Sequence, residues 1–151
     1  MESKETRVLI VEDNDALRVM LFTILRHQPL AVDTATSSAE ALEKVLTCDY
    51  ALILIDMGLI GDDATLFLSQ FGETRPDATT FIIAVRDPSS DVPLPPNVAA
   101  VLNKPLEIDT LAEVVRECAV VVPPPDDPLP CPPAESDVRD RMERSGSFYS
   151  N

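Results

Sequence analysis

Acidic side chains follow two of the apolar runs in this chain, and a lysine follows a third. Asp56 closes one run, Glu12 and Asp13 close another, and Lys104 follows the third after one intervening residue. In an open α/β sheet the carboxyl ends of neighbouring strands meet at one crevice, so residues far apart in sequence can share it. The spacing therefore predicts a single acidic pocket with one cation, which suits a divalent metal ion and a phosphoryl group.

The chemistry expected of this pocket follows from its crowded carboxylates. They repel one another, and Mg²⁺ relieves such crowding with one or two carboxylates, carbonyl oxygens and water while leaving positions for phosphate oxygens. Asp56 stands at a strand-to-loop exit with the small Gly58 two residues on, so it is accessible enough to attack phosphorus. Lys104 supplies a point charge for a phosphoryl oxygen.

Each of these residues also has a simpler interpretation. Asp13 alone could cap a helix, because Asp is strongly preferred at that position. Lys104 alone could be an ordinary surface lysine. The shared site is favoured because the acidic residues and Lys104 all fall at the predicted ends of strands on the two sides of the switch point of the sheet.

Hydrophobic periodicity predicts the elements that must position these residues. Short apolar runs predict five strands, at residues 8–11, 30–35, 52–55, 80–85 and 99–102. Apolar positions at helical spacing predict four helices, and the predicted N-terminal signals of the first three are Asn14 or Asp15, the capping box that begins at Ser37, and Asp62 or Asp63. Strands that alternate with helices indicate an α/β fold, a doubly wound parallel sheet of flavodoxin-like order 2-1-3-4-5.

Two proline-rich segments interrupt the pattern. Residues 87–96, between the fourth and fifth predicted strands, contain four prolines. The helix that the flavodoxin-like fold has at this place, its fourth, is therefore predicted to be short or missing. Seven of the 14 prolines fall in residues 123–133. We therefore expect one domain over residues 1–122 and a disordered, Pro-rich tail over residues 123–151 whose deletion leaves the melting temperature nearly unchanged.

Composition excludes several classes of function. A formal net charge of −14 argues against direct binding of nucleic acid, which is driven by Lys and Arg. No apolar stretch approaches the roughly 20 residues that span a bilayer, and the N-terminus carries no signal-peptide pattern, so we expect a cytoplasmic protein. The cysteines Cys48, Cys118 and Cys131 show no CxxC or metal-ligand spacing, which predicts neither a disulfide nor a zinc site.

Three segments resemble the signature of the response-regulator receiver domain of two-component signalling. They are Val8 to Asn14, Leu52 to Met57, and Asn103 to Leu106, and the match extends from residue 7 to about residue 120. The resemblance implies a non-enzymatic phosphoprotein in which Asp56 accepts a phosphoryl group from a histidine kinase or phosphotransferase protein. It also implies the roles of the neighbouring residues: Asp13, Asp56 and the carbonyl of Gly58 bind Mg²⁺, Glu12 acts through water, and Lys104 contacts the phosphoryl group.

Two positions depart from the family pattern. Where the family has a Thr or Ser at the end of the fourth strand, this sequence has Arg86, and where it favours an aromatic residue three positions before the lysine, it has Val101. The usual hydroxyl switch is therefore missing. We expect Arg86 to lean toward Asp56 and to hold a phosphoryl oxygen, because its planar fork fits carboxylate and phosphate oxygens.

The sequence thus predicts a stand-alone phosphoacceptor that signals through contacts with a downstream protein target. The alternative is a phosphorylation-independent pseudo-receiver, an interaction module in which Arg86 neutralises the acidic pocket. A hydrolase with an aspartyl nucleophile is disfavoured, because that chemistry commonly wants a second acidic residue two positions after the nucleophile, where Gly58 stands. A nucleotide site is disfavoured because neither glycine-rich phosphate-binding motif occurs.

Overall fold

Five parallel strands form one sheet at the centre of the molecule. The computed structural model describes residues 6–59, 61–123 and 128–138. The strands lie in the order β2-β1-β3-β4-β5, which confirms the predicted doubly wound topology. Their bounds are β1 Thr6–Val11, β2 Leu30–Ala35, β3 Leu52–Asp56, β4 Phe81–Arg86 and β5 Ala100–Asn103.

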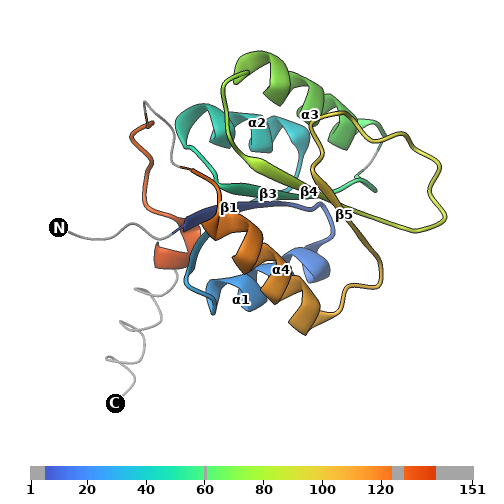
Figure 1. Ribbon diagram of the computed structural model, residues 1–151, viewed down its shortest axis with the longest axis horizontal. Helices are drawn as coiled ribbons and strands as arrows, with labels where there is room; N and C mark the ends of the chain where they lie inside the picture. Colours follow the sequence, from blue (N-terminus) through green and yellow to red (C-terminus); the bar gives the residue numbers. More distant parts are fainter. Residues whose placement is uncertain (1–5, 60, 124–127, 139–151) are drawn as a thin grey trace.

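Helices cover both faces of the sheet. In Figure 1, α2 and α3 lie on one side of the strands, and α1 and α4 lie on the other. The helices that cover the sheet are α1 Asp15–Arg26, α2 Ser38–Thr47, α3 Asp63–Thr74 and α4 Ile108–Val120. Each face has its own apolar core, so the sheet is buried on both sides as doubly wound folds require.

The apolar runs of the sequence are continuous because neighbouring residues of a strand serve different cores. In β1, Leu9 and Val11 face the core under α2 and α3, whereas Val8 and Ile10 face the core under α1 and α4. A strand with water on one side would need a polar residue at every second position. Full burial of β1 and β3 therefore accounts for the unbroken apolar sequence that precedes Glu12 and Asp56.

Side chains at the helix starts behave as predicted for α1 and α2 and differ at α3. Asn14 caps α1 by accepting a hydrogen bond from the backbone N–H of Leu17, and Ser37 accepts one from Glu40. Asp62 occupies the N-cap position of α3 without a side-chain cap bond. Asp63 instead accepts hydrogen bonds from the backbone and hydroxyl of Ser38, which ties α3 to the start of α2.

The connection from β4 to β5 contains no helix, as the prolines in this segment predict. Residues 87–99 form turns and extended chain. The segment is held to the domain by the Asn97 side chain, which donates to the Leu68 carbonyl at 3.0 Å, and by Val98, which packs on the α2–α3 core. The surface between β4 and β5 therefore differs from that of a flavodoxin-like fold with a helix at this place.

The prediction of a disordered tail is wrong for residues 128–138. This segment returns to the far edge of the sheet and lies beside β2, where Ala134 and Ser136 are buried (Figure 1). Its polar groups supply acceptors for the free N–H groups of an edge strand, which composition alone does not reveal. Residues 124–127 and 139–151 lie outside the described residues, and the domain boundary at residue 122 stays a prediction.

The prediction of unpaired thiols is also wrong for two of the three cysteines. Cys48 and Cys131 form a disulfide, and Cys118 is free. The sequence separation of 83 residues gives no local pattern of the kind that identifies a cysteine pair. Across the described ranges, no helix has the length and apolar character that a membrane span needs.

Candidate functional site

The predicted pocket lies where the topology changes direction. β1 lies between β2 and β3, so the chain leaves β1 and β3 toward opposite sides of the sheet. Val11 pairs with Ile55, which places the residues after them, Glu12 and Asp56, side by side at the same edge. The fold therefore brings together the two carboxyl groups that the sequence places 44 positions apart.

Asp56 is buried at the end of β3 with its carboxylate held at both oxygens. One oxygen, Oδ2, accepts a hydrogen bond from Lys104 Nζ at 2.8 Å, and Oδ1 accepts one from the backbone N–H of Gly58 at 2.8 Å. Only 5% of the residue is exposed. Gly58 belongs here for a steric reason, because a Cβ at this position would stand 3.1 Å from Asp56 Oδ1, closer than most real contacts.

Glu12 is even more deeply buried and lies against Asp56. Its exposed fraction is 1%, and Oε2 accepts a hydrogen bond from the backbone N–H of Asn14 at 3.1 Å. Burial raises the pKa of the Glu12 carboxyl to about 8, and a hydrogen bond with Asp56 adds to the rise. Two carboxyl groups this close cannot both ionise freely, so Glu12 retains the proton.

Asp56 is the ionised member of the pair. Burial by itself would raise its pKa, but hydrogen bonds with Glu12, Lys104 and Gly58 outweigh burial and hold the pKa below the usual range. The environments thus push the two acids in opposite directions, a pattern often found where carboxyl groups have different chemical roles. The carboxylate that carries the charge, Asp56, is the one predicted to act as the nucleophile.

Lys104 reaches the pocket from the turn after β5. Burial lowers the pKa of its ammonium group, but the hydrogen bond to Asp56 and the charges of Asp56 and Glu12 reverse this and raise it. The Lys104–Pro105 peptide bond is cis. The side chain is 35% exposed, so its ammonium group can meet a ligand that arrives from solvent.

Asp13 follows Glu12 at the same edge and is half-buried. Its carboxylate oxygens are the hard donors that Mg²⁺ prefers. Among the described residues no group of three or more His, Cys, Asp or Glu side chains is arranged as a metal centre. Mg²⁺ needs only one or two carboxylates, with carbonyls and water completing its shell, so the donor set of Asp13, Asp56 and the Gly58 carbonyl fits this ion.

Arg86 does not form the expected contact with Asp56. Within the described part of the chain, its side chain makes no hydrogen bond or ion pair, and its Nε is buried without a partner. The position of Asp56 Oδ2 is already taken by Lys104, which removes the electrostatic reason for Arg86 to approach. The pseudo-receiver alternative, in which Arg86 neutralises the pocket, has no contact between Arg86 and Asp56 to support it among the described residues and stays a hypothesis.

The second departure from the family pattern, Val101, lies on β5 with 37% of its surface exposed. It pairs with Ala84 of β4, two residues before Arg86. The edge strand β5 therefore presents a small aliphatic side chain to solvent where a large ring would otherwise stand.

An open groove beside Lys104 was not predicted from the sequence. It has a volume of about 490 Å³ and is lined by Leu17, Met20, Asp87, Lys104, Pro105 and Leu106. The signal in the sequence is the apolar helical repeat that contains Leu17 and Met20, and the structure shows that Met20 is 36% exposed. Leu17, Met20 and Leu106 bring several apolar side chains together in this groove, and a contiguous exposed apolar patch is typical of a partner-binding surface.

The fold and this pocket together define a doubly wound α/β domain with an acidic site at the ends of β1 and β3. The sequence model of the response regulator receiver domain matches residues 8–116. The chain belongs to the response regulator receiver domain family.

Curated relatives agree with this assignment. The transcriptional regulatory protein PmrA of Pectobacterium parmentieri is 31% identical over 112 residues, which cover 73% of this chain and 50% of PmrA. The chain spans about half the length of this relative and less of the transcriptional regulatory protein ResD of Bacillus subtilis, which is 32% identical over 74 residues, 49% of this chain and 31% of ResD.

Solved structures share the fold. A CheY-like response regulator receiver domain protein from Methanospirillum hungatei is 25% identical with a TM-score of 0.67, covering 78% of this chain and 96% of that protein. The receiver domain of Ssk1 from Saccharomyces cerevisiae, crystallised with the histidine phosphotransfer protein Ypd1, is 21% identical with a TM-score of 0.69, over 80% of this chain and 93% of that domain.

Proposed function

We propose that this protein accepts a phosphoryl group on Asp56 from the phosphohistidine of a histidine kinase or phosphotransferase protein. The observation that carries the proposal is the arrangement at Asp56, a buried carboxyl group that accepts a hydrogen bond from Lys104 and is crowded by the buried Glu12. In this proposal the protein is the substrate of the phosphotransfer and not an enzyme.

The transfer forms one bond and breaks one. An oxygen of the Asp56 carboxylate attacks phosphorus, the P–N bond to the donor imidazole breaks, and the imidazole leaves with the bonding electron pair and takes up a proton. Lys104 is bound to Asp56 Oδ2 beforehand and pairs with a phosphoryl oxygen afterwards, because a point charge can follow the negative charge as it moves.

Magnesium ion is the implied cofactor. Asp13, Asp56 and the Gly58 carbonyl would hold it, and Glu12 would act through water. When bound, the ion supplies neutralisation of the charge on the phosphoryl oxygens. The residues of the chain do the rest: Gly58 N–H fixes the orientation of the Asp56 carboxylate, and burial in the sheet edge limits access of water.

The groove beside Lys104 is the proposed binding surface for the phosphodonor protein. Leu17 and Met20 of α1 and Leu106 after β5 give it an apolar lining next to the ammonium group. A donor helix that carries a phosphohistidine could cover these side chains and present phosphorus to Asp56. The Ssk1 receiver domain was crystallised with a histidine phosphotransfer protein, which supports a partner of this class for a domain of the same fold.

Intact-mass measurement after treatment with a small acyl-phosphate donor tests the proposal. We expect the mass of one phosphoryl group with Mg²⁺ and none after chelation of the metal. The Asp56→Asn variant should stay unmodified, whereas Asp109→Asn, which removes an exposed carboxylate from α4, should react as the parent does. An Asp56→Asn variant that still gains the mass would place the modification elsewhere and overturn the proposal.

Arg86 is the second residue proposed to contact the phosphoryl group. Its buried Nε has no partner, and an unsatisfied buried donor is costly, so an acceptor oxygen brought into reach would relieve it. An Arg86→Ala variant should then lose the phosphoryl group faster than the parent, whereas Arg116→Ala on the exposed side of α4 should not. Equal lifetimes would remove Arg86 from the site.

Output is proposed to pass through a protein target in the cytoplasm. The net charge of −14 disfavours direct contact with nucleic acid. The helix-free β4–β5 connection, together with Arg86 and Val101, changes the surface on which phosphorylation would be detected. The partner must therefore recognise a surface that differs from that of a receiver with a helix between β4 and β5.

A further inference from the structure

The outer edge of β2 is covered by the chain itself. Thr34 and Val32 point their backbone N–H groups away from β1, where an edge strand leaves such donors unpaired. Val32 N–H donates to Ser136 Oγ at 2.8 Å, and Thr34 N–H donates to Glu135 Oε1. Two side chains from residues 128–138, which we name the strap, thus replace the missing neighbour strand.

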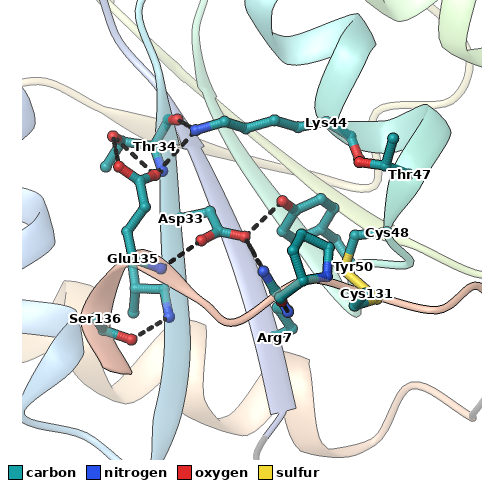
Figure 2. Close-up of polar contacts among 12 residues, drawn as sticks. Arg7, Asp33, Thr34, Lys44, Thr47, Cys48, Tyr50, Cys131, Glu135 and Ser136 are labelled. Carbon is teal, nitrogen blue, oxygen red and sulfur yellow. Dashed lines mark hydrogen bonds and ion pairs between the residues drawn. A yellow bond between two sulfur atoms is a disulfide. The ribbon is translucent and has the colours of Figure 1, made fainter. Parts of the chain in front are cut away.

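The strap is seated on a buried carboxylate in β2. Asp33 is 3% exposed and accepts the backbone N–H of Glu135 at 2.8 Å through Oδ1. Its other oxygen, Oδ2, accepts from Arg7 Nε, Arg7 Nη2 and the Tyr50 hydroxyl, so the carboxylate is held in place for the strap (Figure 2). Arg7 also donates to the Pro132 carbonyl, which attaches a second point of the strap to the same group.

A further set of contacts joins the strap to α2. Lys44 Nζ donates to Glu135 Oε1 at 3.0 Å and to the Thr34 carbonyl, as Figure 2 shows. Lys44 therefore links the helix, the edge strand and the strap. The contact is 26% exposed on the lysine side and 44% on the glutamate side, so solvent weakens it.

The strap buries little apolar surface of its own. Among its described residues, only Ala134 and Ser136 are buried, and Leu129 is half-buried. Small or polar residues of this kind contribute little hydrophobic stabilisation. The polar contacts above replace contacts with water and add modestly. A segment held in this way needs another constraint to stay in place.

The disulfide between Cys48 and Cys131 supplies that constraint. Cys48 follows α2 and is 1% exposed, whereas Cys131 lies on the strap and is exposed. The bond closes a loop across 83 positions of sequence. An attacking thiolate can approach from the side of Cys131, while the sulfur of Cys48 remains inside the domain.

We propose that the Cys48–Cys131 disulfide is a thiol–disulfide exchange site whose reduction releases the strap from β2. The co-reactant is a dithiol: one thiolate attacks Cys131 Sγ, the Cys48–Cys131 bond breaks, and Cys48 leaves as a thiolate that takes up a proton. The second thiol of the reductant then displaces Cys131, so that the dithiol is oxidised to a disulfide and both cysteines are reduced. Disulfides in a reducing compartment are usually transient or redox-sensing, which fits the proposed cytoplasmic location.

The first test counts thiols. The parent, isolated without reductant and alkylated with N-ethylmaleimide in denaturant, should gain one label, on Cys118, and three after reduction with dithiothreitol. Three labels before reduction, persisting after treatment with oxidised glutathione, would overturn the proposal because the bond would not form.

The second test measures hydrogen exchange of the β2 amides in oxidised and reduced protein. Exchange at Val32 and Thr34 should be at least tenfold faster in the reduced form, while the amides of β3 should be unchanged. The Cys131→Ser variant should show the fast exchange without reductant, and the matched Cys118→Ser variant should behave as the parent does. Unchanged protection of Val32 and Thr34 in reduced protein would overturn the proposal, because the strap would then stay docked without its covalent link.

Both tests are independent of phosphoryl transfer. They need neither Mg²⁺ nor a phosphodonor, so a failure of Asp56 to react leaves their outcome intact. Conversely, if reduction of the disulfide does not release the strap, the mass change expected at Asp56 is unaffected.

Discussion

Two buried carboxylates in this domain differ in how completely they are satisfied. Asp33 accepts four hydrogen bonds, two from Arg7, one from the Tyr50 hydroxyl and one from the Glu135 backbone. Asp56 accepts one from Lys104 and one from Gly58, and its third hydrogen-bond partner is another acid, Glu12. Both carboxylates are paired with a cation, yet their surroundings are opposite.

The difference separates a structural carboxylate from a reactive one. At Asp33 both oxygens accept hydrogen bonds, three at Oδ2 and one at Oδ1, so the group is held by the fold and stabilises it. The Tyr50 hydroxyl belongs to this closed network, and its pKa is raised first by burial and then by the charge of Asp33. At Asp56 the crowding by Glu12 leaves a site that a metal ion and a phosphoryl group can complete.

Replacement of Asp56 by Asn should give the largest effect on chemistry and almost none on folding. Phosphoryl uptake should be lost completely, because the amide oxygen is a poor nucleophile. The free energy of unfolding should stay within about 1 kcal/mol of the parent or rise, since the change removes one of two crowded acids. Urea denaturation and intact mass measure the two parts. A loss of more than about 2 kcal/mol would show that Asp56 supports the fold as Asp33 does.

Replacement of Asp33 by Asn should act in the reverse way. It leaves Arg7 without its charge partner, and breaking a buried pair costs about 3 kcal/mol at the lower end of the usual range. Phosphorylation of Asp56 should persist in the folded fraction. The control is Asp15→Asn, which breaks an ion pair with Arg18. The Asp15 side chain is 88% exposed, so this change should cost less than about 1 kcal/mol. Equal stability of the two variants would show that the Asp33 network adds nothing.

Replacement of Ser136 by Ala tests the strap without touching the disulfide. The backbone N–H of Val32 loses its acceptor at a buried position, which should lower the free energy of unfolding by about 1 kcal/mol. Thermal denaturation of the oxidised protein measures the effect. Ser89→Ala, in which the lost hydroxyl bonds Asp87 on an exposed loop, should change stability by less than about 0.5 kcal/mol. The expectation that the tail contributes no stability would be restored if both variants matched the parent.

The pH dependence of Mg²⁺ binding locates the proton of the acidic pair. Because the pKa of Glu12 is raised to about 8, the group holds its proton near neutral pH and must release it when a cation enters the pocket. Affinity for Mg²⁺ should then rise with pH between about 6 and 8, by at most about tenfold per unit for one proton. Glu12→Gln should flatten this slope and Glu113→Gln on α4 should not.

The same pKa fixes the sign of the stability change without metal. The folded state holds the Glu12 proton up to about pH 8, whereas the unfolded state releases it near the ordinary value of 4.5. Between these values the folded state binds more protons, so stability without Mg²⁺ should fall as pH rises. A rise in stability over this range that vanishes in Glu12→Gln would contradict the assignment of the proton to Glu12.

Several features of the domain could be predicted from local sequence. The apolar runs identified all five strands to within one or two residues at each end, because full burial of a strand requires such runs. The prolines of residues 87–96 predicted the missing helix, because proline lacks the N–H that a helix needs. Asp56, Glu12 and Lys104 were found together because the topology of a doubly wound sheet fixes where strand ends meet.

Only the tertiary structure decided the state of the C-terminal segment, the cysteines and Arg86. Ser136 and Val32 are 104 positions apart, and Cys48 and Cys131 are 83 apart, so no periodicity or motif connects them. The free N–H groups of an edge strand can be satisfied by any polar segment that reaches them, and a Pro-rich composition indicates disorder even where such a partner exists. Arg86 was placed correctly at the end of β4, but its expected contact with Asp56 does not form, and Lys104 holds that carboxylate instead. Local sequence determines which elements form and which side chains share an edge, while competition between distant polar groups is settled only when the chain is folded.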